Sequence, residues 1–342
     1  MVDAVVRTTP AGLLAAAAEP LFGPGGVPVD PLVVVDLDGP VDAAGLAAAV
    51  AATPRLVVGT SGGVPAPDVV EALDLTLVTG PERHRATVAV ADLEAAVDAL
   101  VAAVVQNPQA ALVLARLLRW SSMLPVPDAL DAESLAYSTL LGGPEFRRWL
   151  TARGPRPLPP DVPDPVLLAR DGAVLRITLN RPQRRNAYGR QLRDALVDGL
   201  RVAELDPTIT RVVVDGAGPC FCSGGDLDEF GTTPDLVTAH LIRTHGGAAL
   251  PLHRLADRAE VRVHGTCVGA GVELPSFARR VVAAPGTTFR LPELAMGLVP
   301  GAGGTVSITR RIGRWRCLYL ALSGTALDVE RALAWGLVDE IS

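Results

Sequence analysis

The chain has 342 residues, and 31 arginine plus lysine residues against 37 aspartate plus glutamate residues give it a formal charge of −6. All of these cations are arginines, which excludes lysine Schiff-base chemistry, pyridoxal anchoring and a Walker-type phosphate loop. The negative charge argues against a general nucleic-acid or anionic-membrane binder, and 49% hydrophobic with 20% charged residues is typical of a globular protein.

The N-terminal apolar run Leu13–Ala18 is too short to span a membrane, and Asp3 and Arg7 do not fit the start of a signal peptide. The four cysteines form no C-x-x-C pair, so we interpret them as buried thiols in a reduced compartment. We therefore expect a cytoplasmic protein that binds neither nucleic acid nor membrane and holds no metal.

The segment Gly154–Pro165 has six prolines in twelve residues and is predicted to be an extended linker. It divides the chain into a first part, residues 1–153, and a second part, residues 166–342. The first part contains few polar residues of the catalytic kind, and its single histidine, His84, lies in a predicted loop. Periodicity in this part predicts strands at 32–37 and 56–59, and helices at 42–52, 91–105, 110–120, 133–141 and 144–152.

The second part begins with a predicted hairpin, in which strands at 166–170 and 173–179 flank the turn pair Asp171-Gly172. An alternation of strands, glycine-rich turns and helices follows, which predicts an α/β fold with right-handed crossovers. The predicted strands are 211–215, 260–264 and 280–284, and the helices are 187–204, 269–278, 304–312, 314–322 and 329–335.

Two glycine-rich turns, Phe221–Leu227 and His264–Leu274, each lie between a predicted strand and a helix. Glycine allows backbone N–H groups to approach a ligand, and the first N–H groups of a helix have no internal partner. Two such turns that converge would give two donors to one oxygen, which is an oxyanion hole. Either turn alone is weak support for this interpretation, because glycine turns before helices are common.

Glu273 and Glu293 lie in apolar surroundings, where a carboxylate is disfavoured unless it is paired or functional. Two carboxylates in one site can act as base and acid if their environments separate their pKa values. Three histidines, His240, His245 and His253, have spacings that do not place all of them on one helix face, so we expect no metal site there.

Residues from about 166 to 341 resemble the crotonase, or enoyl-CoA hydratase/isomerase, superfamily. Five motifs occur in order: LNRPQRRNA, FCSGGDL, HGTCVGAGVEL, FRLPELAMGLVPGAGG and SGTALDVERALAWGLVDEI. The resemblance implies a crotonase-like spiral of ββα units that binds an acyl-CoA thioester. It places the thioester carbonyl between the N–H groups of Gly225 and Ala270, and it matches Glu273 and Glu293 to the two hydratase glutamates.

The resemblance also implies a substrate surface formed by Ser223, Gly224, Asp226, Leu227, Gly269 and Pro292. Arg184 and Arg185 match the region that contacts the nucleotide of CoA. Two departures stand out. Pro275 is predicted to bend the helix that aims Glu273, and Arg290 is available to a carboxylate or to substrate.

Family members continue past the GLVDEI motif into a helical tail, whereas this chain stops at Ser342. Residues 91–153 resemble that tail, and residues 31–80 resemble a worn-down crotonase sheet. Two interpretations stay open for the first part: a degenerate crotonase-like duplicate, or helices that supply the missing cover across the linker.

The resemblance predicts an enzyme that adds water to a 2-enoyl-CoA or removes it, with coenzyme A as part of the substrate and no separate cofactor. Alternatives are another reaction on a specialised acyl-CoA, such as double-bond isomerisation, cofactor-free oxygenation or C–C cleavage, and a non-catalytic acyl-CoA-binding subunit. A homo-oligomer, as a trimer or hexamer, is also expected from the family.

Overall fold

The computed structural model describes residues 6–13 and 19–342. The apolar run Leu13–Ala18 therefore lies outside the described residues except for Leu13. Within the described ranges, no single helix combines the length and apolar character needed to cross a membrane. One pair, Leu93–Gln106 with Pro108–Ser121, bent by 108°, matches by length and composition alone.

The first part of the chain forms a five-stranded sheet whose strands pair in chain order and are all parallel. Its strands are continuous apolar runs because both faces are covered: Val33 and Val35 pack with α2 and α3, while Leu32 and Val34 face the main core. The elements are β1 (Val6–Thr8), η1 (Pro24–Gly26), β2 (Leu32–Asp36), α2 (Ala43–Ala52), β3 (Leu56–Ser61), α3 (Pro67–Ala72), β4 (Leu75–Val78) and β5 (Thr87–Ala89).

Four helices follow this sheet, as predicted: α4 (Leu93–Gln106), α5 (Pro108–Ser121), α6 (Val126–Leu141) and α7 (Pro144–Arg153). The side chain of Asp92 caps α4 by accepting a hydrogen bond from the N–H of Ala95 at 3.1 Å. Helix α6 begins earlier than the predicted 133, with a proline in its first turn, where the missing N–H costs nothing.

The second part is built on a six-stranded sheet of order β14-β11-β9-β8-β7-β6, parallel except for the β6–β7 hairpin. The hairpin turn is one residue later than predicted, since Asp171 pairs with Val174 and Gly172 adopts a φ of 55°. The strands are β6 (Val166–Asp171), β7 (Val174–Leu179), β8 (Arg211–Gly216), β9 (Ala259–Val263), β11 (Arg280–Ala283) and β14 (Glu340–Ile341).

A second, small sheet joins β10 (Thr266–Val268), β12 (Thr288–Arg290) and β13 (Leu327–Asp328). The predicted helix at 269–278 is wrong in extent: α11 covers only Ala270–Glu273, and a 3-10 turn, η5 (Pro275–Phe277), follows because proline lacks the N–H that would continue the helix. The remaining helices are α8 (Arg190–Leu205), α9 (Leu236–Gly246), α10 (Ala249–Arg254), α12 (Gly304–Ile312), α13 (Arg314–Ser323) and α14 (Val329–Trp335), with short turns η2 (Pro182–Arg184), η3 (Leu227–Glu229), η4 (Ala256–Arg258) and η6 (Glu293–Met296).

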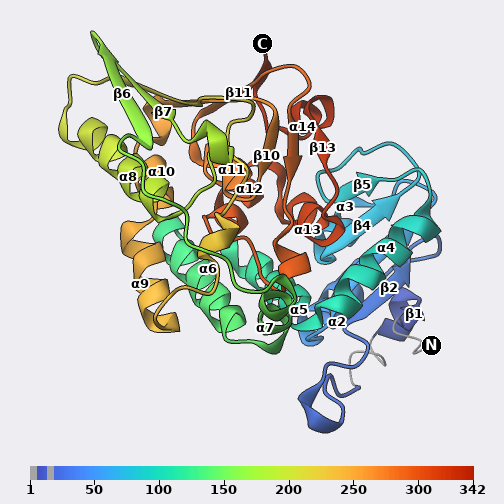
Figure 1. Cartoon of the computed structure of the whole chain (residues 1–342). Coiled ribbons are helices and arrows are strands. Elements are labelled where there is room, and N and C mark those ends of the chain that lie inside the picture. The colour runs from blue at the N-terminus through green and yellow to red at the C-terminus, as the bar shows by residue number, and fades with distance from the viewer. Residues whose placement is uncertain (1–5, 14–18) are drawn as a thin grey trace.

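The two parts of the chain share one hydrophobic core, although the linker between them has no regular structure. Helices α5 and α6 pack on α12, α4 and α5 pack on α13, and α7 packs on η6; Figure 1 shows α6 lying beside α9. Buried hydrogen bonds join them: Asn107 Nδ2 donates to the carbonyl of Leu294 at 2.8 Å, and Ser121 Oγ donates to that of Thr305 at 2.7 Å. Helices of the first part therefore pack against the second part. The four cysteines are free and buried, as predicted.

Candidate active site

The two predicted glycine-rich turns lie against each other. The N–H of Val268 donates to the carbonyl of Cys222 at 3.1 Å, which joins the second turn to the first. Gly271 allows this approach, because a Cβ there would lie 2.2 Å from that carbonyl oxygen. Gly224, with a φ of 89°, similarly faces the carbonyl of Val268.

Gly225 in the first turn and Ala270 in the second line a common cavity. Ala270 is the first residue of α11, so its N–H has no partner inside that helix. In the part of the chain that the structure describes, we find no acceptor for either N–H group. Both donors are therefore available to an oxygen of a bound ligand.

Glu273 is the last residue of α11 and is buried, with 2% of its surface exposed. Its Oε2 accepts hydrogen bonds from the N–H groups of Ala302 and Gly304, both at 2.8 Å, at the start of α12. Burial raises the pKa of Glu273 to about 7, although the two N–H donors oppose the shift. A carboxyl group that titrates near neutrality suits a general base.

Glu293 begins η6, directly after Pro292, and is also buried. Its Oε2 has no hydrogen-bond partner, which is unusual for a buried polar atom. Burial, followed by the charge of Glu273, raises the pKa of Glu293 well above its ordinary value. Glu293 therefore holds its proton more tightly than an exposed glutamate does.

The two glutamates converge beside Gly269. A Cβ at Gly269 would lie 2.4 Å from Glu293 Oε1 and 3.7 Å from Glu273 Oε1, so both oxygens lie next to one point of the backbone. Gly269 has a φ of 48°, and its N–H donates to the carbonyl of Arg290 at 2.9 Å. The two acids therefore lie close together, and their action with the N–H groups of Gly225 and Ala270 stays a prediction.

A cavity of about 490 Å³ contains the two glutamates and both N–H donors. Ser223, Gly224, Asp226, Leu227 and Pro292 also line it, whereas Gly269 does not, and substrate binding by these residues stays a prediction. Aromatic side chains form much of the remaining wall, namely Tyr137, Trp149, Tyr188 and Phe230, and the arginines that line it are Arg153, Arg190, Arg193 and Arg243.

Sequence reasoning missed the contribution of the first part of the chain to this site. Glu133 on α6 is buried at 2% exposure and accepts hydrogen bonds from the N–H groups of Gly303 at 2.7 Å and Thr305 at 2.9 Å. Tyr137, one helical turn later, is so close to Gly301 that a Cβ there would lie 2.3 Å from its ring. Glu133 was not among the candidate residues taken from the sequence. The available signal was a glutamate within the apolar stretch ESLAYSTLL.

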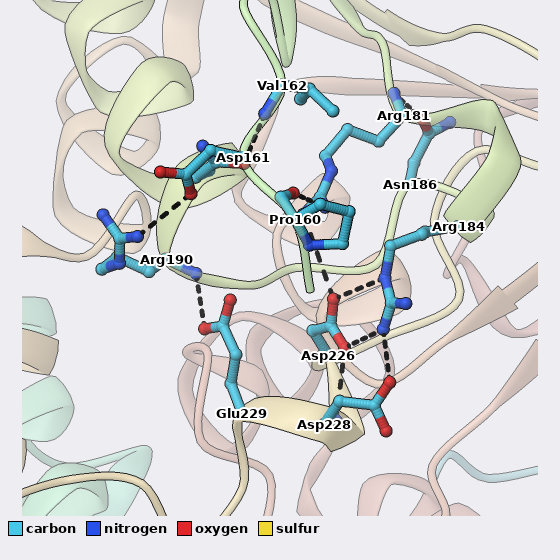
Figure 2. A network of polar contacts seen from close by, with 11 residues as sticks. Pro160, Asp161, Val162, Arg181, Arg184, Asn186, Arg190, Asp226, Asp228 and Glu229 are labelled. Carbon is cyan, nitrogen blue, oxygen red and sulfur yellow. Dashed lines mark hydrogen bonds and ion pairs between the residues drawn. The ribbon is translucent and has the colours of Figure 1, made fainter. Parts of the chain in front are cut away.

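The predicted nucleotide contacts are arranged differently (Figure 2). Arg184 is held by Asp226, with contacts of 3.0 and 2.6 Å, and by Asp228 at 2.8 Å. Asp226 is buried, and its side chain caps η3 by accepting from the N–H of Asp228. Arg185 is exposed with a φ of 52°, and neither arginine lines the cavity. A contact of either with CoA stays a prediction.

Arg290 does not line the cavity, and its contact with substrate stays a prediction. Its Nε donates to the carbonyl of Gly324 at 2.6 Å, and its charge opposes the rise in the pKa of Glu293. The histidines are also outside the site: His240 and His245 lie on α9 and His253 lies on α10. Among the residues that the structure describes there is no cluster of three metal-ligating side chains.

Comparisons with known proteins concern mainly the second part of the chain. Residues 169–342 match the family model described as enoyl-CoA hydratase/isomerase. The 2,3-dehydroadipyl-CoA hydratase of Escherichia coli is 34% identical over 176 residues, which are 52% of this chain and 68% of that protein. Mevalonyl-coenzyme A hydratase of Beauveria bassiana is 34% identical over 54% of this chain and 68% of that protein.

The 1,2-epoxyphenylacetyl-CoA isomerase of Escherichia coli is also 34% identical, over 49% of this chain and 66% of that protein. The crystal structure of an enoyl-CoA hydratase from Mycobacterium smegmatis has a TM-score of 0.49 and 28% identity, and covers 52% of this chain and 70% of that one. The chain thus belongs to the enoyl-CoA hydratase/isomerase family, the crotonase superfamily. It spans about two thirds of the length of these curated relatives, and helices α4–α7 lie outside the matched region.

Proposed function

We propose that this protein adds water to the double bond of a 2-enoyl-CoA thioester, or removes water in the reverse direction. The observation that carries the proposal is the convergence of Glu273 and Glu293 in one cavity beside two N–H groups without partners. Membership of the family, and relatives named as hydratases, support it.

In this proposal the thioester oxygen accepts hydrogen bonds from the N–H groups of Gly225 and Ala270. When a nucleophile adds at Cβ, the electron pair of the double bond moves toward that oxygen and forms an enolate. Donors fixed by the backbone stabilise such a charge with little reorganisation, and loss of one such donor typically costs about 10²–10³ in rate.

The two glutamates divide the proton transfers. Glu273 in its ionised form takes a proton from water while the hydroxide adds to Cβ, because its pKa of about 7 leaves a large ionised fraction at neutral pH. Glu293, whose pKa is raised, then gives its proton to Cα of the enolate. The net change is the addition of one water, and proton exchange between the two groups through solvent restores the starting state.

The experiment measures the loss of conjugated enoyl-thioester absorbance with crotonyl-CoA and with longer and aromatic 2-enoyl-CoAs. We expect Glu273→Gln and Glu293→Gln each to lower kcat by about 10²–10⁴. Glu260→Gln is the matched control, because Glu260 is a buried carboxylate on β9 that pairs with Arg211 and Arg262 outside the cavity. Folded protein that turns over no member of the panel would overturn the proposal.

The same panel distinguishes the alternatives. Conversion of a 3-enoyl-CoA to its 2-enoyl isomer without hydration would identify double-bond isomerisation. Oxygen consumption or a shortened acyl chain would identify oxygenation or C–C cleavage. CoA-thioester binding that persists while both glutamine variants leave every activity unchanged would identify a binding subunit.

A further inference from the structure

Two carboxyl groups from different parts of the chain accept hydrogen bonds from the N-terminal end of one helix, α12. Four consecutive N–H groups at the entry to α12 are divided alternately between them. Those of Ala302 and Gly304 donate to Glu273, and those of Gly303 and Thr305 donate to Glu133. Thr305 Oγ1 adds a third hydrogen bond to Glu133, at 2.6 Å.

The start of a helix offers unpaired N–H groups and a partial positive charge of roughly half a unit, which suits one carboxylate. Two full negative charges at the same turn repel each other, as in other pairs of carboxyl groups that share a site. No arginine in the described ranges forms an ion pair with either Glu133 or Glu273. The helix end is therefore the main source of stabilisation for both groups.

The groups around Glu133 do not remove the repulsion between the Glu133 and Glu273 carboxylates. They are Glu273 on α11, Glu293 on η6, Arg243 on α9, Cys317 on α13 and Tyr137 on α6 itself. The guanidinium of Arg243 donates to Ser134 and Ser138 and lies over the ring of Tyr137. Its charge attracts Glu133, but it forms no hydrogen bond or ion pair with Glu133 or Glu273. Burial, followed by the charge of Glu273, raises the pKa of Glu133 to about 8.

We infer that Glu133 is a positioning residue for Glu273: it fixes the turn at 302–305 that binds Glu273, and it shares with Glu273 a single negative charge. The inference rests on the proposed role of Glu273 as the base. It makes a residue outside the family-matched region part of the acid–base machinery. The two apparent pKa values then belong to the pair of glutamates and not to either residue alone.

The kinetic test is the pH profile of hydration. In the wild type, kcat/KM rises with pH over a wider range than the titration of a single group. The reason is that the one negative charge of the pair lies on Glu273 in only a fraction of the molecules until both glutamates are ionised. In Glu133→Gln no second carboxylate competes for the N–H groups of the turn. The pH profile of kcat/KM therefore becomes that of a single titrating group, and its midpoint moves down by up to about one pH unit. A uniform loss of rate with no change in midpoint or width would overturn the inference.

Two further variants keep this test decisive. Thr305→Val removes only the hydroxyl that stabilises ionised Glu133, so the charge moves to Glu273 and the midpoint moves down by a smaller amount. An unmoved midpoint in this variant also counts against the inference. Ser121→Ala is the matched control, because Ser121 joins α5 to the carbonyl of Thr305 without a charge, and its midpoint stays at the wild-type value.

A substrate-free measurement separates this inference from the proposed function. The number of protons taken up on folding between about pH 5 and 9 follows from the pH dependence of the free energy of unfolding. We expect non-additive values for Glu133→Gln, Glu273→Gln and the double variant, since each group shifts the other. Additive values would overturn the inference. If the values are non-additive but the protein hydrates no thioester, the coupling of Glu133 with Glu273 is supported and only the proposed hydratase function is rejected.

Discussion

Substitution of Gly304 by alanine tests whether the backbone at the start of α12 positions Glu273. Gly304 is the first residue of α12 and has an ordinary helical conformation, so its backbone accepts a side chain. A Cβ there would lie 2.7 Å from Glu273 Cγ and 2.8 Å from its Oε2. The added methyl group must therefore displace the carboxylate that the Gly304 N–H binds.

The expected magnitudes follow from these contacts. Alanine gains up to about 1 kcal/mol in helix propensity, whereas overpacking a buried site costs about 1–3 kcal/mol. The free energy of unfolding therefore falls by only about 0–2 kcal/mol. Displacement of a catalytic group by about 1 Å costs on the order of 10² in rate, so the activity falls far more than the stability.

The assay combines denaturant unfolding with enoyl-thioester hydration kinetics. Gly246→Ala is the control, since a Cβ at this position in α9 meets no atom within 4 Å. We expect wild-type kcat in the control and a loss of about 10² in Gly304→Ala. A Gly304→Ala enzyme that keeps kcat within about threefold of wild type would refute the argument that this approach sets the position of Glu273.

Two other predictions concern contacts outside the catalytic pair. Glu82 accepts hydrogen bonds from Arg331 at 2.6 Å and Trp335 at 2.7 Å, and despite burial these contacts lower the pKa of Glu82 below 4.5. Glu82→Gln should lower the free energy of unfolding, measured in urea at pH 7, by about 1–2 kcal/mol. This difference from the wild type should vanish as the pH falls through the lowered pKa of Glu82. A difference that stays constant down to pH 2 would contradict the prediction. Arg184→Met leaves buried Asp226 without its closest cation, so the free energy of unfolding should fall by about 1–3 kcal/mol, while an unchanged unfolding midpoint would show that Arg181, at 4.0 Å, suffices.

The second part of the chain was largely predictable because its signals are local. Its glycine turns, the apolar surroundings of Glu273 and Glu293, and the order of five motifs all lie within short stretches of sequence. The short strands β10, β12 and β13 were not predicted, because two or three residues carry no periodicity. The hairpin was found, but its turn was placed one residue early.

The role of Glu133 was not predictable in the same way. Its partners, Gly303 and Thr305, are about 170 residues away, and no local pattern links a glutamate on an amphipathic helix to a distant helix end. The hydrogen bond of Arg290 was not predictable for a related reason. Its acceptor is the carbonyl of Gly324, on a segment whose position depends on the pairing of β12 with β13.

The placement of the covering helices affects how the enzyme is made by the ribosome. Helices α4–α7 are synthesised before the strands and turns that they cover, and contacts such as Asn107 to Leu294 and Ser121 to Thr305 join residues more than 180 positions apart. Contacts at such separation form slowly. During translation the apolar faces of α5 and α6 therefore stay uncovered until α12 and α13 have been synthesised. We expect a nascent chain halted before α12 to associate with chaperones or to aggregate.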